Sequence, residues 1–415
     1  MFNLARRDMI LGGAALSLLP PFALPDLAAA TRREERTLPP PIGREERVAR
    51  IAKAQRLMRD HEIGAILVEA GPSLDYFTGV RWGRSERLTA AFIPAQGDIV
   101  LVTPFFEKPS VEESLGIEAI VRPWHEHEEP LAIVAAEMAR QMPGMRRIGM
   151  EETNRFWIAD RLKGVAPHLD IVSANPVVRG CRMIKTPAEL ALIEAANLMT
   201  LEAIREVHGA IKAGMTGGDV SAMLGKAMRD RGGSSPWALV LVNEASALPH
   251  GTKAPQVIQR GSVVLIDTGC ALQGYQADIS RTFVFDADPS AEVRKVWNQV
   301  ARGRDIAMKA ATVGATAGSV DDAVRAAYES WGYGPDYALP GMSHRTGHGI
   351  GMEGHEPVNF VRGELTRLQP GMCFSNEPGL YFPGKFGVRL EDIITITETG
   401  ARWFTGPPKS IDEPI

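Results

Sequence analysis

Two apolar patterns alternate along the first 180 residues of the chain. Apolar residues that recur at every third or fourth position predict helices, at residues 44–61, 126–141 and 156–165. Short apolar runs bounded by turn-forming residues predict strands, at residues 65–68, 90–94 and 99–103, the last two forming a hairpin. Because helices and short strands alternate, we expect an α/β domain over residues 44–180.

A predicted junction between two domains precedes a capped helix. Thr186 can cap this helix, with Pro187 at its first position and Glu189 in its first turn. We expect the helix to end at Gly214. The remaining pattern, with strands separated by long helices, indicates an α+β domain over residues 181–415. The strands are predicted at 239–242, 263–268, 282–285 and 388–390, and the helices at 291–311 and 319–331.

The N-terminus has the pattern of an export signal. Arg6 and Arg7 precede an apolar run at residues 9–19, and Ala28-Ala29-Ala30 offers a cleavage site, which is typical of the twin-arginine route. The run is shorter than the roughly 20 residues that span a bilayer. We therefore expect an exported, periplasmic protein without a membrane partner after processing. We assign residues 1–30 to the signal and residues 31–43 to a linker.

Length and composition limit the other function classes. The chain has 415 residues, about twice the usual size of one domain. Its formal net charge is -4, so no overall positive field exists to hold nucleic acid. The three cysteines are too few and too widely spaced for a disulfide framework or a zinc knuckle, and we expect them to be buried. They are Cys181, Cys270 and Cys373.

Two aspartates are the first candidates for chemistry. Asp267 ends an apolar strand pattern, and Asp278 lies eleven residues later inside another strand pattern. A short connection containing Gly274 can set both side chains on one face of a sheet. Two bare carboxylates there would repel each other, so one would stay protonated unless a cation lay between them.

Three further residues extend this pair to a candidate metal centre. His348 lies in a glycine-rich turn pattern, and Glu377 and Glu391 lie in apolar or glycine-rich surroundings. Four carboxylates and one histidine suit two divalent first-row metals about 3.5–4 Å apart. A water that bridges such metals becomes a hydroxide nucleophile near neutral pH.

These blocks resemble the pita-bread metallopeptidases, a group that includes Xaa-Pro aminopeptidases, prolidases, methionine aminopeptidases and the metal-free creatinases. The resemblance runs from about residue 45 to about residue 405. It implies a creatinase-like α/β N-terminal domain followed by an α+β pita-bread catalytic domain. The matching blocks are Asp75-Tyr76-Phe77-Thr78-Gly79, Arg182-Met183-Ile184-Lys185-Thr186-Pro187-Ala188-Glu189, His344-Arg345-Thr346-Gly347-His348-Gly349-Ile350-Gly351 and Glu353-Gly354-His355-Glu356-Pro357.

The resemblance also implies a role for each metal-site residue. Asp267 is expected to hold one metal, and Asp278 and Glu391 are expected to bridge both. His348 and Glu377 complete the other metal, and Glu377 is also the expected proton shuttle.

Three residues outside the ligand set are expected to act on the substrate. His250 and His355 resemble accessory histidines that steady the scissile carbonyl oxygen and the tetrahedral intermediate. Arg389 could orient Glu391 or bind a substrate carboxylate. We interpret the remaining histidines as structural or solvated; they are His61, His125, His127, His168, His208 and His344.

The expected activity is hydrolysis of Xaa-Pro bonds in short peptides, by an Xaa-Pro aminopeptidase or an Xaa-Pro dipeptidase. The resemblance implies two divalent metal ions, with Mn expected first and Co, Fe or Zn as alternatives, and a homodimer. Two other hypotheses stay open. The same centre could act on a non-peptide small molecule by C–N hydrolysis or lyase chemistry, or the chain could be a non-catalytic binding protein, which the intact ligand set argues against.

Overall fold

The computed structural model describes residues 37–415 of the chain. The predicted export signal at residues 1–30, and the first part of the predicted linker, lie outside the described residues. Within the described part, no helix is both long and apolar enough to cross a membrane. Residues from Pro39 to Ile415 form one compact unit.

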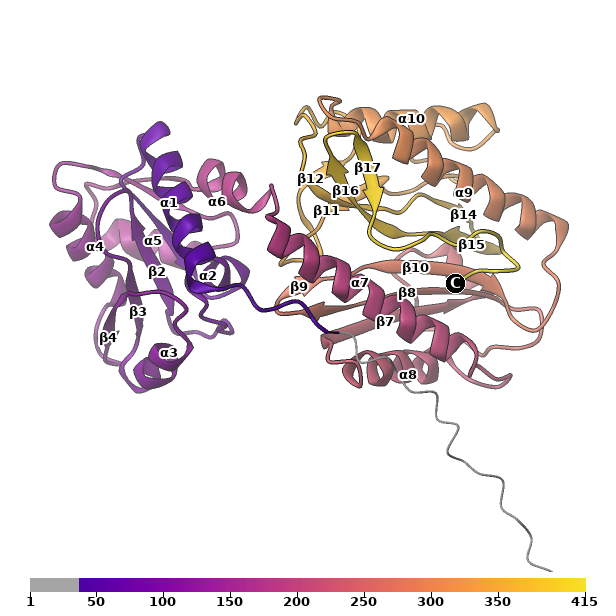
Figure 1. Cartoon of the computed structure of the whole chain (residues 1–415), viewed down its shortest axis with the longest axis horizontal. Coiled ribbons are helices and arrows are strands. Elements are labelled where there is room, and N and C mark those ends of the chain that lie inside the picture. Colours follow the sequence, from indigo (N-terminus) through magenta and orange to yellow (C-terminus); the bar gives the residue numbers. More distant parts are fainter. Residues whose placement is uncertain (1–36) are drawn as a thin grey trace, which may run out of the picture. The chain divides into compact units, whose positions relative to one another are not determined.

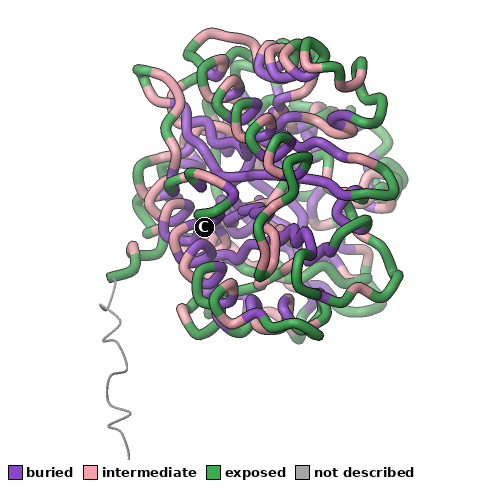
Figure 2. The backbone as a smooth tube through the Cα atoms, turned by 90° about the vertical axis from the view of Figure 1, so that its right-hand side faces the viewer, coloured by how far each residue is buried: buried purple, intermediate pink, exposed green. Residues whose placement is uncertain are grey.

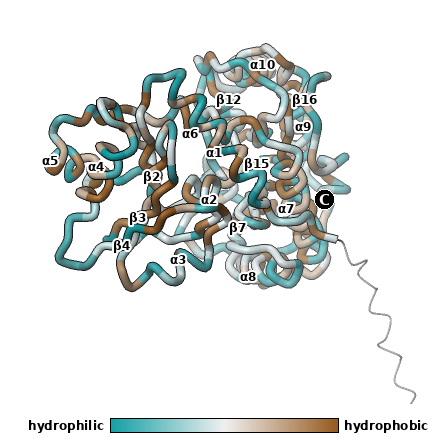
Figure 3. The backbone as a smooth tube through the Cα atoms, turned by 60° about the vertical axis from the view of Figure 1, so that its left-hand side comes forward, coloured by the Kyte–Doolittle hydropathy of each residue, from teal (hydrophilic) through white to brown (hydrophobic). Residues whose placement is uncertain are grey.

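A mixed six-stranded sheet organises the first half of this unit, with strand order β4-β3-β2-β1-β5-β6 (Figure 1). Its strands are β1 (Ala65–Glu69), β2 (Ala90–Pro94), β3 (Val100–Pro104), β4 (Ile120–Trp124), β5 (Arg147–Met150) and β6 (Asp170–Ser173). Strands β2 and β3 pair antiparallel, which confirms the predicted hairpin. The two strands are strongly apolar (Figure 3), and Gly97 supplies the positive φ of 117° that their connection requires.

Helices cover both faces of this sheet and complete the predicted α/β domain. They are α1 (Arg44–Asp60), α2 (Pro72–Thr78), α3 (Lys108–Ser114), α4 (Pro130–Gln141), α5 (Phe156–Val165) and α6 (Asn175–Arg182), with a short 3-10 turn η1 (Phe105–Glu107) before α3. The predicted start of α4, at residue 126, is four residues too early. Pro130 occupies the first helical turn, and the Glu129 side chain caps the helix by accepting the backbone N–H of Leu131.

The second half begins with the helix α7 (Pro187–His208). Its predicted start is confirmed, because Thr186 and Glu189 form a reciprocal capping box. Its predicted end at Gly214 is wrong. The helix stops at His208, and Gly214 lies in a later turn with a φ of 90°, where its N–H bonds to the carbonyl of Ile258.

Two main sheets and a hairpin form the α+β domain. The first sheet has the order β10-β8-β7, the second has the order β12-β11-β13-β16-β17, and β14 pairs with β15. Helices α7 and α8 lie along the first sheet, and α9 and α10 lie along the second (Figure 1). The first-sheet elements are α8 (Gly217–Arg229), β7 (Ser234–Val242), η2 (Asn243–Ala247), β8 (Val263–Leu272), β9 (Tyr275–Gln276) and β10 (Ile279–Val284). The remaining elements are α9 (Ala291–Ala310), α10 (Ala317–Ser330), β11 (Gly347–Gly349), β12 (Glu356–Phe360), β13 (Cys373–Asn376), β14 (Gly379–Phe382), β15 (Phe386–Arg389), β16 (Asp392–Thr397) and β17 (Gly400–Trp403).

Most strands lie in the buried interior, whereas the helices expose their outer faces (Figure 2). Strands β6 and β17 are exceptions that contain no buried residue. The three cysteines are free and buried, as predicted. Burial raises the pKa of the Cys181 and Cys373 thiols to about 11, and it raises the pKa of the Cys270 thiol in the same direction. All three are therefore neutral, poorly reactive thiols.

Candidate metal centre

Three carboxylates meet where β8, β10 and β16 lie next to one another. Asp267 lies within β8 and pairs in register with Ser280 of β10. Asp278 lies just before β10, in the gap after β9, rather than inside a strand as predicted. Glu391 lies between β15 and β16 and forms a backbone bridge with Ser280. Asp267 and Glu391 therefore both lie beside Ser280, although they are far apart in sequence.

His348 and Glu377 reach the same place from the second sheet. His348 lies in β11, so the expected glycine-rich turn is a strand. The flanking glycines are needed for close strand packing. A Cβ on Gly347 would lie 2.1 Å from the carbonyl oxygen of Ser375, and one on Gly349 would lie 2.6 Å from that of Glu356. His348 Nε2 lies 3.4 Å from Glu377 Oε1.

The five predicted ligands and His355 form three overlapping groups of three residues, and within each group the donor atoms lie within 4.8 Å of one another. These groups are Asp267, Asp278 and Glu391; His348, Glu377 and Glu391; and Asp278, His348 and His355. Glu391 belongs to the two groups made only of predicted ligands. A carboxylate shared between two sets of donors has the placement that a bridging ligand needs.

Electrostatics in this cluster favour a bound cation. Burial, and then the neighbouring carboxylates, raise the pKa of Asp278 and of Glu391 well above their ordinary values. Burial also raises the pKa of Glu377 to about 7. Asp278 Oδ1 and Glu391 Oε1 are buried and have no hydrogen-bond partner among the described residues. Because oxygen donors without partners are costly to bury, the residues fit divalent metal ions.

His348 is prepared as a metal ligand. Burial, and then the neighbouring His355, lower its pKa well below the ordinary value, so the imidazole is neutral. Its Nδ1 lies 3.1 Å from the carbonyl oxygen of Gly349. This contact assigns the proton to Nδ1 and leaves the Nε2 lone pair facing the carboxylates.

Arg389 orients two of the carboxylates. Its guanidinium forms an ion pair with Asp267, and its Nε donates to Ser280 Oγ at 3.0 Å. Ser280 Oγ also lies 2.9 Å from Asp267 Oδ1 and 2.8 Å from Glu391 Oε2. Of the two roles expected for Arg389, this geometry supports carboxylate orientation, directly for Asp267 and through Ser280 for Glu391.

A cavity of about 800 Å³ opens onto the cluster. Its lining residues all fall between positions 237 and 391, and they include the five predicted ligands as well as His250, His355 and Arg389. Six other residues that line it were not predicted as site residues. They are Trp237, Leu239, Pro249, Gly354 and the polar His344 and Arg345.

His344 was predicted to be structural or solvated, but it lines the cavity. Its Nε2 lies 2.7 Å from the Tyr381 hydroxyl, and its Nδ1 lies 2.7 Å from the carbonyl oxygen of Arg345. Burial lowers its pKa to about 3, so the ring is neutral. The one signal in the sequence was its position four residues before His348. Trp237 had no comparable signal.

A buried ion cluster positions the segment that carries His355. Glu356 accepts the backbone N–H of Met352 at 2.8 Å, and it pairs with Arg182 at 2.6 Å and with Lys185 at 3.0 Å. Burial alone would raise the pKa of Glu356, but Lys185 and Arg182 together outweigh it and lower the pKa to about 2. The His355 ring lies against the His348 ring with centroids 4.1 Å apart.

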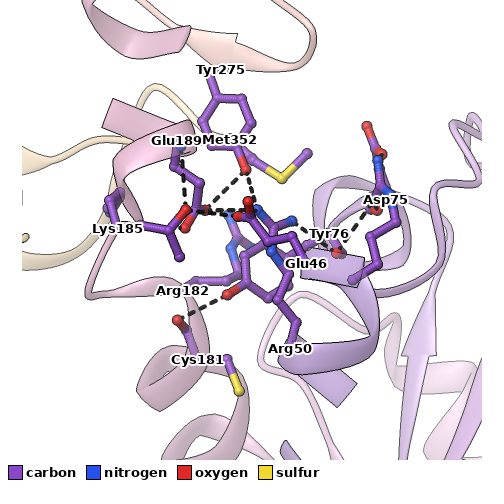
Figure 4. A network of polar contacts seen from close by, with 12 residues as sticks. Glu46, Arg50, Asp75, Tyr76, Cys181, Arg182, Lys185, Glu189, Tyr275 and Met352 are labelled. Atoms are coloured by element: carbon purple, nitrogen blue, oxygen red, sulfur yellow. Dashed lines mark hydrogen bonds and ion pairs between the residues drawn. The ribbon is translucent and has the colours of Figure 1, made fainter. Parts of the chain in front are cut away.

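Polar contacts around this cluster join the α/β and α+β domains (Figure 4). Arg50 of α1 donates to the Tyr275 hydroxyl at 2.9 Å, which in turn donates to Glu189 of α7 at 2.9 Å. Tyr76 donates to the carbonyl oxygen of Cys181 at 3.0 Å. Arg50 also donates to the carbonyl oxygen of Tyr76 at 3.0 Å, so the block from Asp75 to Gly79 lies beside the contact between the domains. None of its residues lines the cavity.

This α/β plus α+β arrangement, with a buried carboxylate and histidine cluster that lines a cavity, is that of a metal-dependent hydrolase. Residues 191–398 match Metallopeptidase family M24, and residues 50–184 match the Creatinase/Prolidase N-terminal domain. The chain belongs to metallopeptidase family M24 and has the pita-bread fold of its prolidase branch.

Similar proteins support this assignment along most of the chain. The probable dipeptidase PepE of Mycobacterium tuberculosis is 32% identical over 363 residues, which cover 85% of this chain and 92% of that protein. The Xaa-Pro dipeptidase of Pyrococcus furiosus is 28% identical, over 86% of this chain and 97% of its own. The crystal structure of dipeptidase PepE from Mycobacterium ulcerans superposes with a TM-score of 0.81 at 30% identity, covering 89% of this chain and 98% of that one.

Proposed function

We propose that this peptidase hydrolyses Xaa-Pro bonds in short peptides and that it uses two divalent metal ions. The observation that carries the proposal is the overlap of the donor groups, in which Glu391 is shared between Asp267 and Asp278 on one side and His348 and Glu377 on the other. Two bound metal ions would supply a Lewis acid and an activated water. The expected metal is Mn, with Co, Fe or Zn as alternatives.

The side chains around the cluster have three further roles, which are carboxylate positioning, proton transfer and stabilisation of developing charge. Asp267 is fixed by Arg389 and Ser280. Glu377 lines the cavity and is the expected proton shuttle, which would take a proton from the attacking water and return it to the leaving nitrogen. His250 and His355 line the cavity. They can stabilise the charge that develops on the scissile carbonyl oxygen.

Proline explains why a small cavity suits the reaction. The Xaa-Pro bond is a tertiary amide without an N–H, so a protease that grips its substrate as a β-strand loses one hydrogen bond at this position. A pocket that holds the ring and the chain ends avoids that loss. A similar protein from Pyrococcus furiosus is named an Xaa-Pro dipeptidase, which supports the same specificity here.

A peptide and metal panel tests the proposal. Purified protein is loaded separately with Mn, Co, Fe or Zn and assayed on Ala-Pro, Met-Pro, Ala-Pro-Ala and the matched peptides Ala-Ala and Met-Ala. We expect release of the N-terminal residue from the proline peptides, with a clear preference over the matched pairs. Absence of cleavage with every metal would contradict the proposal and favour a non-peptide substrate.

We also propose that the protein is exported to the periplasm as a folded, metal-loaded protein. The support is the Arg6-Arg7 pair, the apolar run and the alanine cleavage site. The double variant Arg6→Lys/Arg7→Lys should leave the protein in the cytoplasm, as measured by cell fractionation. Unchanged export of the variant would contradict the twin-arginine route.

A homodimer is the proposed assembly. Its support is the resemblance to relatives in which the first domain helps to restrict access to the metal site. Light scattering coupled to gel filtration should give about twice the mass of the mature chain. A monomer mass at micromolar concentration would overturn this assembly.

A further inference from the structure

Two arginines line the cavity, and only one of them is committed to the metal cluster. Arg389 is buried and fully engaged with Asp267, Ser280 and Tyr381. Arg345 is half-buried, and within residues 37–415 its guanidinium has no hydrogen bond, ion pair or stacking partner. The backbone carbonyl oxygen of Arg345 contacts His344 Nδ1. Its side chain lines the cavity, and no carboxylate of the described residues pairs with the guanidinium there.

The metal cluster does not need this second positive charge. Two divalent cations would already balance the four carboxylates, and Arg389 adds another positive charge beside Asp267. A free guanidinium at the same cavity is therefore a recognition group for a negative charge that arrives with the ligand. Arg345 is also close enough to act on its neighbours: burial is the main cause that lowers the pKa of His348 and His355, and the positive charge of Arg345 adds to it. The same charge opposes the burial that raises the pKa of Glu377 to about 7.

The chemistry of a guanidinium fits one part of a peptide substrate. Its planar fork pairs with a carboxylate through two parallel hydrogen bonds. In an Xaa-Pro dipeptide the free carboxylate is attached to the proline Cα, next to the scissile nitrogen. In a longer peptide a neutral amide occupies that position, and the carboxylate lies at least one residue further away.

We propose that Arg345 binds the C-terminal carboxylate of an Xaa-Pro dipeptide and thereby makes this protein a dipeptidase rather than an aminopeptidase. The assignment rests on the proposed Xaa-Pro hydrolysis. Arg345 acts in it as a specificity-determining residue, while Arg389 keeps the metal-site carboxylates in place.

The kinetic test compares substrates that differ only at the C-terminal group. Metal-loaded wild type, Arg345→Met and Arg345→Lys are assayed on Ala-Pro, Ala-prolinamide and Ala-Pro-Ala. We expect wild type to prefer Ala-Pro. Arg345→Met should lose about 10- to 100-fold in kcat/KM on Ala-Pro, mainly through KM, because a charge-assisted pair is removed. Its activity on Ala-prolinamide should stay near that of wild type, and Arg345→Lys should retain part of the preference.

A matched control separates this effect from a general loss of charge. Arg260 does not line the cavity, and its side chain is 78% exposed. Arg260→Met should keep the wild-type preference. Elemental analysis should find the same metal content in all variants. A wild type that cleaves Ala-Pro-Ala or Ala-prolinamide as well as Ala-Pro would overturn the proposal, as would an Arg345→Met variant with an unchanged ratio.

A binding measurement keeps the test independent of turnover. Calorimetry with free proline and with prolinamide should show that wild type binds proline more tightly and that Arg345→Met binds both equally. If no Xaa-Pro peptide is cleaved, the proposed function fails, yet this titration still decides the role of Arg345. Equal binding of proline and prolinamide by wild type would reject carboxylate recognition.

Discussion

Two buried carboxylate oxygens, Asp278 Oδ1 and Glu391 Oε1, lack a hydrogen-bond partner in the described part of the chain. Two neighbouring side chains, by contrast, have defined partners. His348 directs its Nδ1 to a backbone carbonyl, and Arg389 holds Asp267. At the scale of single residues, the ligand side chains are therefore oriented before metal binds, and the two free carboxylate oxygens still lack a positively charged partner.

Asp278→Asn tests this arrangement. The amide keeps the size of the side chain but removes the negative charge that is proposed to bridge the two metal ions. We expect the metal content measured by elemental analysis to fall and peptidase activity to drop by about 100-fold or more, since even the loss of an outer partner costs 10- to 100-fold. Full activity with normal metal content would exclude a bridging role.

The same variant should have the opposite effect on stability once metal is removed. In the metal-free protein, burial and the nearby carboxylates oppose ionisation of Asp278, and asparagine escapes that cost. At pH 7 the metal-free variant should be more stable than metal-free wild type, by roughly 1–3 kcal/mol in urea unfolding. A variant less stable than wild type would contradict the electrostatic account.

At the scale of elements, the segment from Gly351 to Glu356 connects the metal site to the domain junction. It carries His355 at the cavity, and it ends at Glu356, which is held by Arg182 at the end of α6 and by Lys185 just before α7. Gly351 is required there because a Cβ would lie 2.7 Å from the Glu356 carboxylate. The position of His355 thus depends on an ion cluster that never enters the cavity.

Glu356→Gln should show this dependence. Removing the anion leaves Arg182 and Lys185 buried without full compensation, which costs about 3–5 kcal/mol. We expect kcat to fall through displacement of His355 while metal content is retained. The exposed Glu398→Gln is the matched control and should leave kcat and stability unchanged. Normal kcat in a destabilised Glu356→Gln protein would limit the cluster to folding.

The sequence predicted elements better than their ends and their contacts. The donors of the metal cluster have local signals, because each lies in an apolar or glycine-rich segment. Arg182 and Glu356 lie 174 residues apart, so no local pattern joins them. Trp237 became a cavity residue only through the packing of distant strands, whereas Arg345 lies three residues before His348. The end of α7 was missed because the turn at Gly214 is stabilised by a hydrogen bond to Ile258, which is distant in sequence.

At the scale of the whole molecule, both metal binding and pH change the free energy of unfolding. Metal bound only to the folded protein adds stability that grows with its concentration, about 2.7 kcal/mol at a hundred times the dissociation constant. Chelation should therefore lower the unfolding temperature, and added Mn should raise it, as measured by calorimetry. No shift in either direction would argue against a site formed by the folded chain.

Acid should weaken the fold through Glu356. Its folded pKa is about 2 against an ordinary 4.5, so its stabilisation is complete above pH 4.5 and is lost as the pH falls towards 2. The loss amounts to roughly 3 kcal/mol. Urea unfolding of metal-free wild type and Glu356→Gln at pH 5 and pH 3 isolates this part, because the other groups are common to both. The wild type should lose more stability than the variant.

The three buried, neutral thiols make the natural chain a ready background for site-specific labelling. Cys181, Cys270 and Cys373 should resist maleimide reagents at neutral pH in the folded protein. A single cysteine introduced at the exposed Phe156 or Leu365 would then be the one position that takes a fluorophore or spin label. Distances between such labels could follow opening of the two domains during turnover without prior removal of native cysteines.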